Sequence, residues 1–145
     1  MLGFVVSRKE EIMNNVPHSN RLTISDLLAA IIQYEVDRSK IDVSNGVVLS
    51  FKDPDYSAEG GGYHPVEIAM QNDGRLMYIT DFSYVGIPPY AELVKELDFD
   101  FGYGVLQQFG REYPLEQAAE IFAMWQTNFV SYHGMGVYRV TVGEL

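Results

Sequence analysis

The sequence predicts a single α+β domain in which an antiparallel sheet of four to five strands carries two main helices on one face. Two long segments, residues 24–38 and 114–133, repeat apolar side chains at helical spacing. Short segments rich in β-branched and aromatic residues lie between them. The pair Asp73-Gly74 predicts a tight hairpin, and tight hairpins imply antiparallel pairing with the helices gathered on one face.

The two helices have recognisable ends. Thr23 or Ser25 can cap the first by accepting a backbone hydrogen bond. Pro114 suits the first position of the second helix, where its missing N–H costs nothing, and Gly134 suits the position just after its end. The buried stripe of the second helix is expected to contain Leu115, Ala118, Ala119, Phe122, Trp125 and Phe129.

The strands are predicted from composition and alternation. They cover residues 46–51, 64–71, 75–85, 97–101 and 137–142, with 105–109 as a further candidate. The prolines at 88–89 interrupt the chain, and residues 91–95 are expected to form a helical turn.

A two-residue Asp73-Gly74 loop would fix the register of the central hairpin. Asn72 would pair with Arg75, Met70 with Met77, Ile68 with Ile79, Val66 with Asp81, and His64 with Ser83. The face carrying Val66, Ile68, Met70, Met77 and Ile79 is expected to pack against the helices.

Composition limits the classes of function. Twenty acidic against ten basic residues give a net charge of −10, and the basic residues are scattered, which makes nucleic-acid binding unlikely. The absence of cysteine excludes disulfides, thiolate catalysis and Cys-ligated metals. No apolar run approaches the roughly 20 residues of a membrane helix. The first residues lack a secretory pattern, so we expect a cytoplasmic protein.

We expect one domain over residues 1–145, with residues 1–22 as a loosely packed N-terminal segment. Ser7 and Glu10 have the spacing of a capping box, which predicts a short helix over residues 8–14.

Four segments carry a resemblance to a known family. They are FKDPDYSAEGGGYHPVEI at 51–68, YITDFSYVG at 78–86, ELVKELDFDF at 92–101 and WQTNF at 125–129. Together they resemble a family of short bacterial proteins catalogued as domain of unknown function 2787. The resemblance implies a single bacterial domain. It implies no activity, cofactor or catalytic residue.

The hairpin register brings possible catalytic groups together. His64 would face Ser83, with Asp81 diagonal to it, and these are the ingredients of an activated nucleophile. The sharp nucleophile turn and oxyanion donors that such chemistry needs are not recognisable, so the sequence favours a protein that is not an enzyme. A hydrolase or small-molecule-binding protein with a pocket at His64, Glu67 and Asp81 stays an alternative.

Asp81 falls on the apolar face, where an unpaired carboxylate is costly. It must therefore be paired, for example with backbone amides or Arg139, or it must line a pocket.

The acidic loop after residue 52 resembles a calcium loop in part. Asp53, Asp55 and Glu59 place oxygen ligands at suitable positions, but Ala58 and His64 stand where an EF-hand needs Gly and Glu. A solvated loop without metal is the favoured interpretation, and no cofactor is predicted.

Loop tyrosines suggest a surface for a partner. Tyr56, Tyr63, Tyr84 and Tyr90, together with His64, are the candidate ligand- or partner-binding residues, since Tyr is common at protein interfaces. The favoured function is a non-enzymatic binding or protein-interaction module. A third alternative is an acidic mimic of nucleic acid. The sequence does not predict an oligomeric state.

Overall fold

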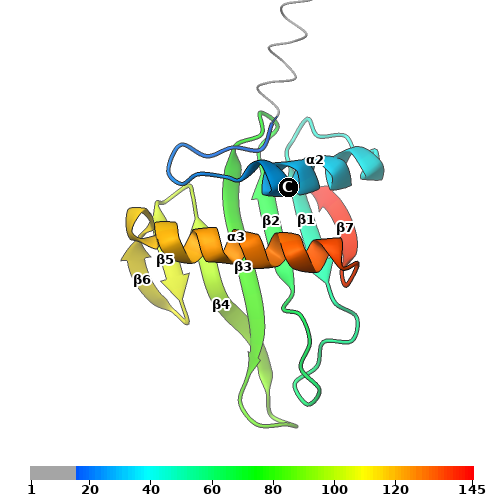
Figure 1. Cartoon of the computed structure of the whole chain (residues 1–145), viewed down its shortest axis with the longest axis vertical. Helices are drawn as coiled ribbons and strands as arrows, with labels where there is room; N and C mark the ends of the chain where they lie inside the picture. The colour runs from blue at the N-terminus through cyan, green and yellow to red at the C-terminus, as the bar shows by residue number, and fades with distance from the viewer. Residues whose placement is uncertain (1–15) are drawn as a thin grey trace, which may run out of the picture.

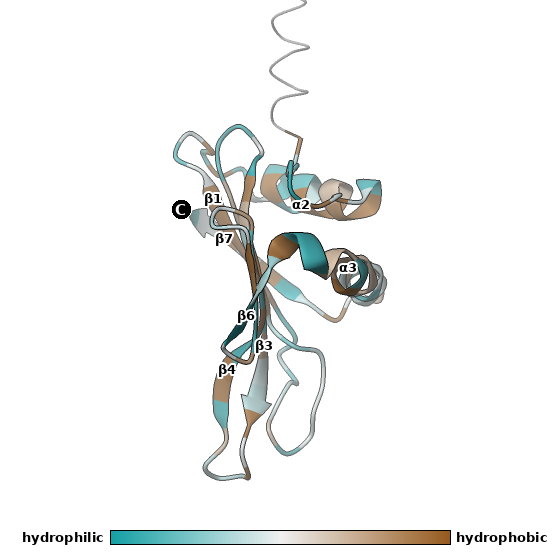
Figure 2. Ribbon diagram, turned by 90° about the vertical axis from the view of Figure 1, so that its left-hand side faces the viewer, coloured by the Kyte–Doolittle hydropathy of each residue, from teal (hydrophilic) through white to brown (hydrophobic). Residues whose placement is uncertain are grey.

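In the computed structural model, residues 16–145 are described, and they form an antiparallel sheet of seven strands with two long helices on one face (Figures 1 and 2). The strands are β1 (Val47–Lys52), β2 (Val66–Met70), β3 (Leu76–Val85), β4 (Glu92–Asp100), β5 (Val105–Gln108), β6 (Arg111–Pro114) and β7 (Arg139–Glu144). Their order across the sheet is β6-β5-β4-β3-β2-β1-β7. The α+β class is confirmed. The short helix predicted over residues 8–14 lies outside the described residues.

The predicted number of four to five strands is wrong. The helical turn expected over residues 91–95 is instead the start of β4, because the ten-residue strand β3 continues past the core and pairs with this segment. Strand β6 was not predicted at all. Each of its four residues is exposed, so it lacks the alternation that identifies a half-buried strand.

The first long helix, α2 (Asp26–Ser39), closely follows its predicted bounds of 24–38. Ser25 caps it, since its Oγ accepts a hydrogen bond from the backbone N of Leu28 at 3.1 Å. Helix α2 ends at Lys40, which adopts a left-handed conformation.

The second helix begins later than predicted. Pro114 ends β6, a 3-10 turn, η1 (Leu115–Ala118), follows it, and α3 (Ala119–Gly134) then crosses the sheet (Figure 1). The predicted cap at Gly134 is also wrong, because Gly134 is still helical and Gly136 takes the left-handed conformation at the end.

The core lies between the helices and the sheet, as Figure 2 shows from the side. Along α3, the rings of Phe122, Trp125 and Phe129 lie nearly parallel, with centroids 6.2 and 5.0 Å apart. Phe51 of β1 and Phe99 of β4 reach this row from the sheet and are fully buried. Aromatic packing of this kind supplies much of the buried area of a small domain.

The predicted hairpin register is correct away from the turn and wrong beside it. Val66 pairs with Asp81 and Ile68 with Ile79, as expected, but Met70 pairs with Leu76 across a bulge. The turn is longer than two residues, since the backbone N of Gln71 donates to the carbonyl of Arg75 at 2.9 Å. Leu76 is therefore buried in the core, and Met77 is only half-buried.

The helix-free face of the sheet carries two hydrogen-bonded carboxylates. The hydroxyl of Tyr78 donates to Glu67 at 2.6 Å, and Thr80 Oγ1 donates to Asp98 at 2.9 Å. Asp98 alternates with the core residues Leu97 and Phe99, so it points away from the helices. Burial raises the pKa of Asp98, and this effect is larger than the stabilising bond from Thr80.

Asp98→Asn is expected to raise the free energy of unfolding at pH 7 by about 1 kcal/mol. The amide oxygen of the Asn side chain can still accept the hydrogen bond from Thr80, but the side chain carries no charge to bury. Because the pKa of Asp98 is higher in the folded protein, the folded protein keeps this proton over a pH range in which the unfolded chain has lost it. Stability is therefore lost as pH rises through the folded pKa. Urea unfolding should show the gain at pH 7 and its disappearance near pH 3.5. Glu92→Gln, at an exposed position of the same strand, is the control.

Candidate functional site

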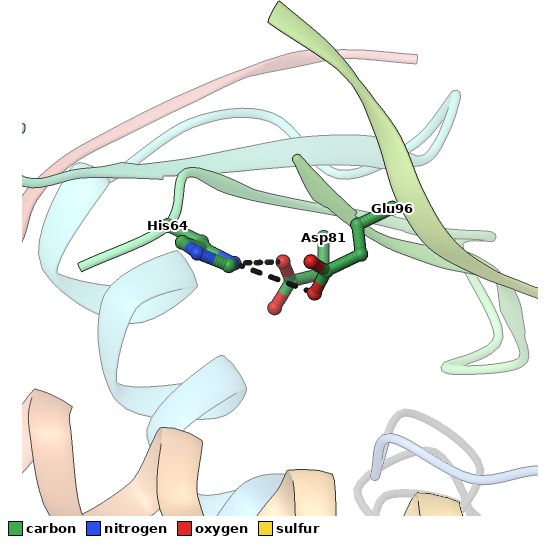
Figure 3. Close-up of side chains that lie close together, drawn as sticks. All are labelled: His64, Asp81 and Glu96. Atoms are coloured by element: carbon green, nitrogen blue, oxygen red, sulfur yellow. Dashed lines mark hydrogen bonds and ion pairs between the residues drawn. The ribbon is translucent and has the colours of Figure 1, made fainter. Parts of the chain in front are cut away.

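A pocket of about 350 Å³ lies between α3 and the strands β3 and β4. Its polar end is formed by His64, Asp81 and Glu96 (Figure 3). Its walls include Tyr63, Met124, Trp125, Phe129, Tyr132 and Tyr138. A concave, largely aromatic cavity with a few convergent polar groups has the general form of a small-ligand site.

Asp81 is the best-anchored group of the polar end. It lies on the helix-facing side of β3, and its side chain is largely buried. One oxygen, Oδ1, is 2.8 Å from His64 Nδ1, and the other, Oδ2, accepts a hydrogen bond from Trp125 Nε1 at 3.0 Å. The partners suggested by the sequence, backbone amides or Arg139, are thus replaced by two side chains, one from the segment before β2 and one from α3.

Glu96 reaches the site because β4 contains a bulge. Asp81 pairs with Leu97 and Phe82 with Lys95, so Glu96 is the extra residue between them. A bulge turns its side chain out of the regular alternation. The carboxylate comes within 3.6 Å of His64 Nδ1. A dashed line marks this contact in Figure 3.

The polar end of the pocket has more acidic than basic side chains. The hydrogen bond to Asp81 raises the pKa of His64, with burial opposing it and the charges of Asp81 and Glu96 adding to it. Burial, and secondarily the charge of Asp81, raises the pKa of Tyr138 in the wall. In the described part of the chain, no Lys or Arg nitrogen lies within 4.0 Å of either carboxylate. Even a protonated His64 therefore leaves one negative charge uncompensated.

Two residues of the predicted catalytic group lie apart from the pocket. Ser83 is buried but is not among the residues that line the pocket, and its side chain shares no hydrogen bond with His64 among the described residues. The predicted pairing of His64 with Ser83 lies beyond the ladder, because β2 begins at Val66, which pairs with Asp81. Glu67 alternates with Val66, so it points to the helix-free face, where it accepts the bond from Tyr78.

The candidate tyrosines lie partly in the pocket and partly outside it. Tyr63 lines the pocket, with its ring 4.6 Å from that of Tyr132. Tyr56 lies beside the His64 ring at 5.4 Å and beside Tyr84 at 5.2 Å, and its hydroxyl accepts a bond from the backbone N of Tyr84. Tyr90 is 85% exposed in the turn between β3 and β4.

Asp53 makes hydrogen bonds within the acidic loop. Asp53 accepts hydrogen bonds from the backbone N of Asp55 at 2.9 Å and of Tyr63 at 3.0 Å. Among residues 16–145, the group of three potential metal ligands is His64, Asp81 and Glu96, and it includes none of Asp53, Asp55 and Glu59.

Sequence reasoning missed Glu96 and the polar role of Trp125. Trp125 was assigned to the core stripe, which is correct for its ring but says nothing of its N–H. A buried Trp N–H needs an acceptor, so an unpartnered Asp on the apolar face could have suggested the pair. No sequence signal marks the bulge that directs Glu96 inward.

Solved structures from Vibrio cholerae are similar over nearly their whole length. The hypothetical protein VC0508 of the VSP-II pathogenicity island is 31% identical, with a TM-score of 0.78, and the match covers 88% of this chain and 98% of that one. The conserved hypothetical protein VC1805 of pathogenicity island VPI-2 is 32% identical, with a TM-score of 0.75, over 87% and 98%. That protein is described as sharing structural homology with the human P32 protein.

No curated protein matches the chain. Within residues 16–145, none of the helices has both the length and the apolar character needed to cross a bilayer. The model of one family matches residues 23–143, which confirms the resemblance seen in the sequence, and the chain therefore belongs to the family described as Protein of unknown function (DUF2787).

Proposed function

We propose that this protein is a non-enzymatic binding domain whose site is the pocket between α3 and the sheet, and that the site binds a positively charged group. The observation that carries the proposal is the convergence of Asp81 and Glu96 at one end of an aromatic cavity, with no Lys or Arg beside them in the described chain. The net charge of −10 adds a long-range attraction for cations.

The pocket favours binding over hydrolysis. A hydrolase of the type considered from the sequence needs a nucleophile hydrogen-bonded to His64, and among the described residues Ser83 neither makes that bond nor lines the pocket. His64 instead bonds to a carboxylate that is itself fixed by Trp125. The aromatic walls suit the apolar part of a ligand, while the carboxylates suit its charged end.

A charge series of one molecular shape tests the proposal. Benzamidine carries the cation, benzamide is its neutral counterpart, and benzoate is the anion. We expect benzamidine to bind at least 10-fold more tightly than benzamide, which corresponds to about 1.4 kcal/mol, and benzoate not to bind. The change in fluorescence of Trp125, the single tryptophan, reports binding in the pocket.

Matched variants identify the site. Glu96→Gln should weaken benzamidine binding about 5- to 10-fold, since it removes one carboxylate without changing the size of the side chain. Glu92→Gln makes the same change at an exposed position of β4 and should leave binding unchanged. Equal affinity for benzamidine and benzamide would contradict the proposal.

A further experiment with a peptide ligand distinguishes two sources of the charged group. A small amine and the Arg or Lys side chain of a protein partner present the same chemistry. A short Arg-containing peptide that binds more tightly than benzamidine, and is weakened by Glu96→Gln, would favour a protein partner. Tighter binding of benzamidine would favour a small molecule.

A further inference from the structure

We propose that His64, Asp81 and Glu96 form a binding site for a divalent transition-metal ion such as Zn²⁺, with His64 Nδ1 and one oxygen of each carboxylate as ligands. This inference rests on the cation-binding pocket proposed above and names the cation. Metal binding needs a lone pair from the imidazole nitrogen of His64, whereas benzamidine binding needs only the carboxylates.

The distances between the three donor atoms suit one shared ion. His64 Nδ1 is 2.8 Å from Asp81 Oδ1 and 3.6 Å from Glu96 Oε2, and all three donor atoms lie within 4.8 Å of one another. An ion that binds N and O ligands at about 2.1 Å places donor pairs about 3.0 Å apart in octahedral and about 3.4 Å apart in tetrahedral geometry. Small side-chain rotations would bring the set to these values. Figure 3 shows the three groups pointing at one another.

The donor types select the class of metal. Calcium and magnesium are bound mainly by oxygen ligands. One imidazole nitrogen with two carboxylate oxygens suits Zn²⁺, Mn²⁺ and related transition metals instead. Two carboxylates and a neutral imidazole would also balance the charge of a divalent ion.

The surroundings of the donors resemble those of bound metals. Trp125 Nε1 donates to Asp81 Oδ2, which fixes the carboxylate and leaves Oδ1 directed at His64. Outer hydrogen bonds of this kind orient the ligands of metal sites. The adjoining pocket leaves at least one coordination position for water or a further ligand, as in sites with three protein ligands.

The test is titration of the full chain, stripped of metal with a chelator and exchanged into clean buffer, with ZnCl₂ at pH 7.5. Calorimetry should show one ion bound per chain. Ni²⁺ or Cu²⁺ should quench the fluorescence of Trp125, because its indole contacts the ligand Asp81. Binding of Zn²⁺ should also displace benzamidine, since both use Glu96.

Variants separate this inference from the proposed function. His64→Gln should weaken Zn²⁺ binding at least 10-fold while benzamidine still binds. Glu96→Gln should weaken both. His18→Gln and Glu92→Gln, at exposed positions, should change neither. Thermal unfolding of each variant verifies that the fold is kept.

Each outcome decides one of the two ideas. If Zn²⁺ fails to bind at 100 µM, or if it binds His64→Gln as well as the unaltered protein, the metal inference is overturned. Benzamidine binding in that case would leave the proposed function standing. If Zn²⁺ binds through His64 and benzamidine does not bind, the metal inference holds, and the positively charged group of the proposed function is the metal ion rather than an organic cation.

Discussion

Truncation of Phe129 to Ala is expected to lower the free energy of unfolding by about 3–5 kcal/mol. Phe129 is 2% exposed and lies where α3 crosses the sheet. Its ring contacts Phe51 edge-on at 4.9 Å and lies nearly parallel to Trp125 at 5.0 Å, and Tyr138 is 5.4 Å away. Removing the ring would leave a cavity that the rings of α3, β1 and the segment before β7 could not close without losing their own contacts.

Urea unfolding followed by far-UV circular dichroism measures this loss. The same truncation at Phe109, which is 55% exposed in the turn between β5 and β6, should cost less than 1 kcal/mol. If the Phe129→Ala protein does not fold, Phe129→Leu fills part of the space and should cost about 1–2 kcal/mol. A loss below 1 kcal/mol for the Ala variant would show that Phe129 is not central to the core.

The parts of the fold that were predictable are those in which local pattern and tertiary packing agree. Helix α2 has apolar residues at helical spacing and a capping Ser25, and its bounds came out almost as expected. The central hairpin turns at the predicted Asp-Gly pair, and Ile68 pairs with Ile79 as expected, although the turn is longer than two residues and a bulge lies beside it. In both cases a few neighbouring residues determine the structure.

The parts that were missed depend on pairing between distant segments. Strand β6 has no buried face, and it is held to β5 by backbone pairing and a hydrogen bond from Gln107 Nε2 to Glu112. The first half of β4 is determined by the length of β3 rather than by its own composition. Sequence pattern alone carries no sign of either.

The candidate site was half predicted for the same reason. His64 and Asp81 were placed near each other by the hairpin, and the expectation that Asp81 needs a partner was correct. The partner from α3, Trp125, and the bulged Glu96 both depend on how α3 and β4 are placed over β3. Those placements depend on tertiary packing, which no local sequence pattern indicates.

Asp81→Ala is expected to lower the free energy of unfolding at pH 6 by about 2–3 kcal/mol, because hydrogen bonds to a charged group contribute about 1.5–3 kcal/mol. The change leaves the buried N–H of Trp125 and the ring of His64 without their acceptor. Trp125→Phe removes only the indole donor from the same interaction. The double variant should therefore cost less than the sum of the two single ones, by about 1–2 kcal/mol. If the loss of stability in the double variant equals the sum of the two single losses, the bond between Asp81 and Trp125 contributes nothing.

The pH dependence of the Asp81 effect has a definite sign. In the metal-free protein, His64 faces Asp81 of β3 and Glu96 of β4, and its pKa is raised by the bond to Asp81. A raised folded-state pKa gives stability that is fully present below the unfolded pKa, about 6.5, and is lost as pH rises through the folded pKa. The destabilisation by Asp81→Ala should accordingly be larger at pH 5.5 than at pH 8.5. NMR titration of the His64 ring should show its pKa falling in the variant. An unchanged His64 pKa would mean that Asp81 does not hold the His64 proton, and the electrostatic description of the pocket would then be wrong.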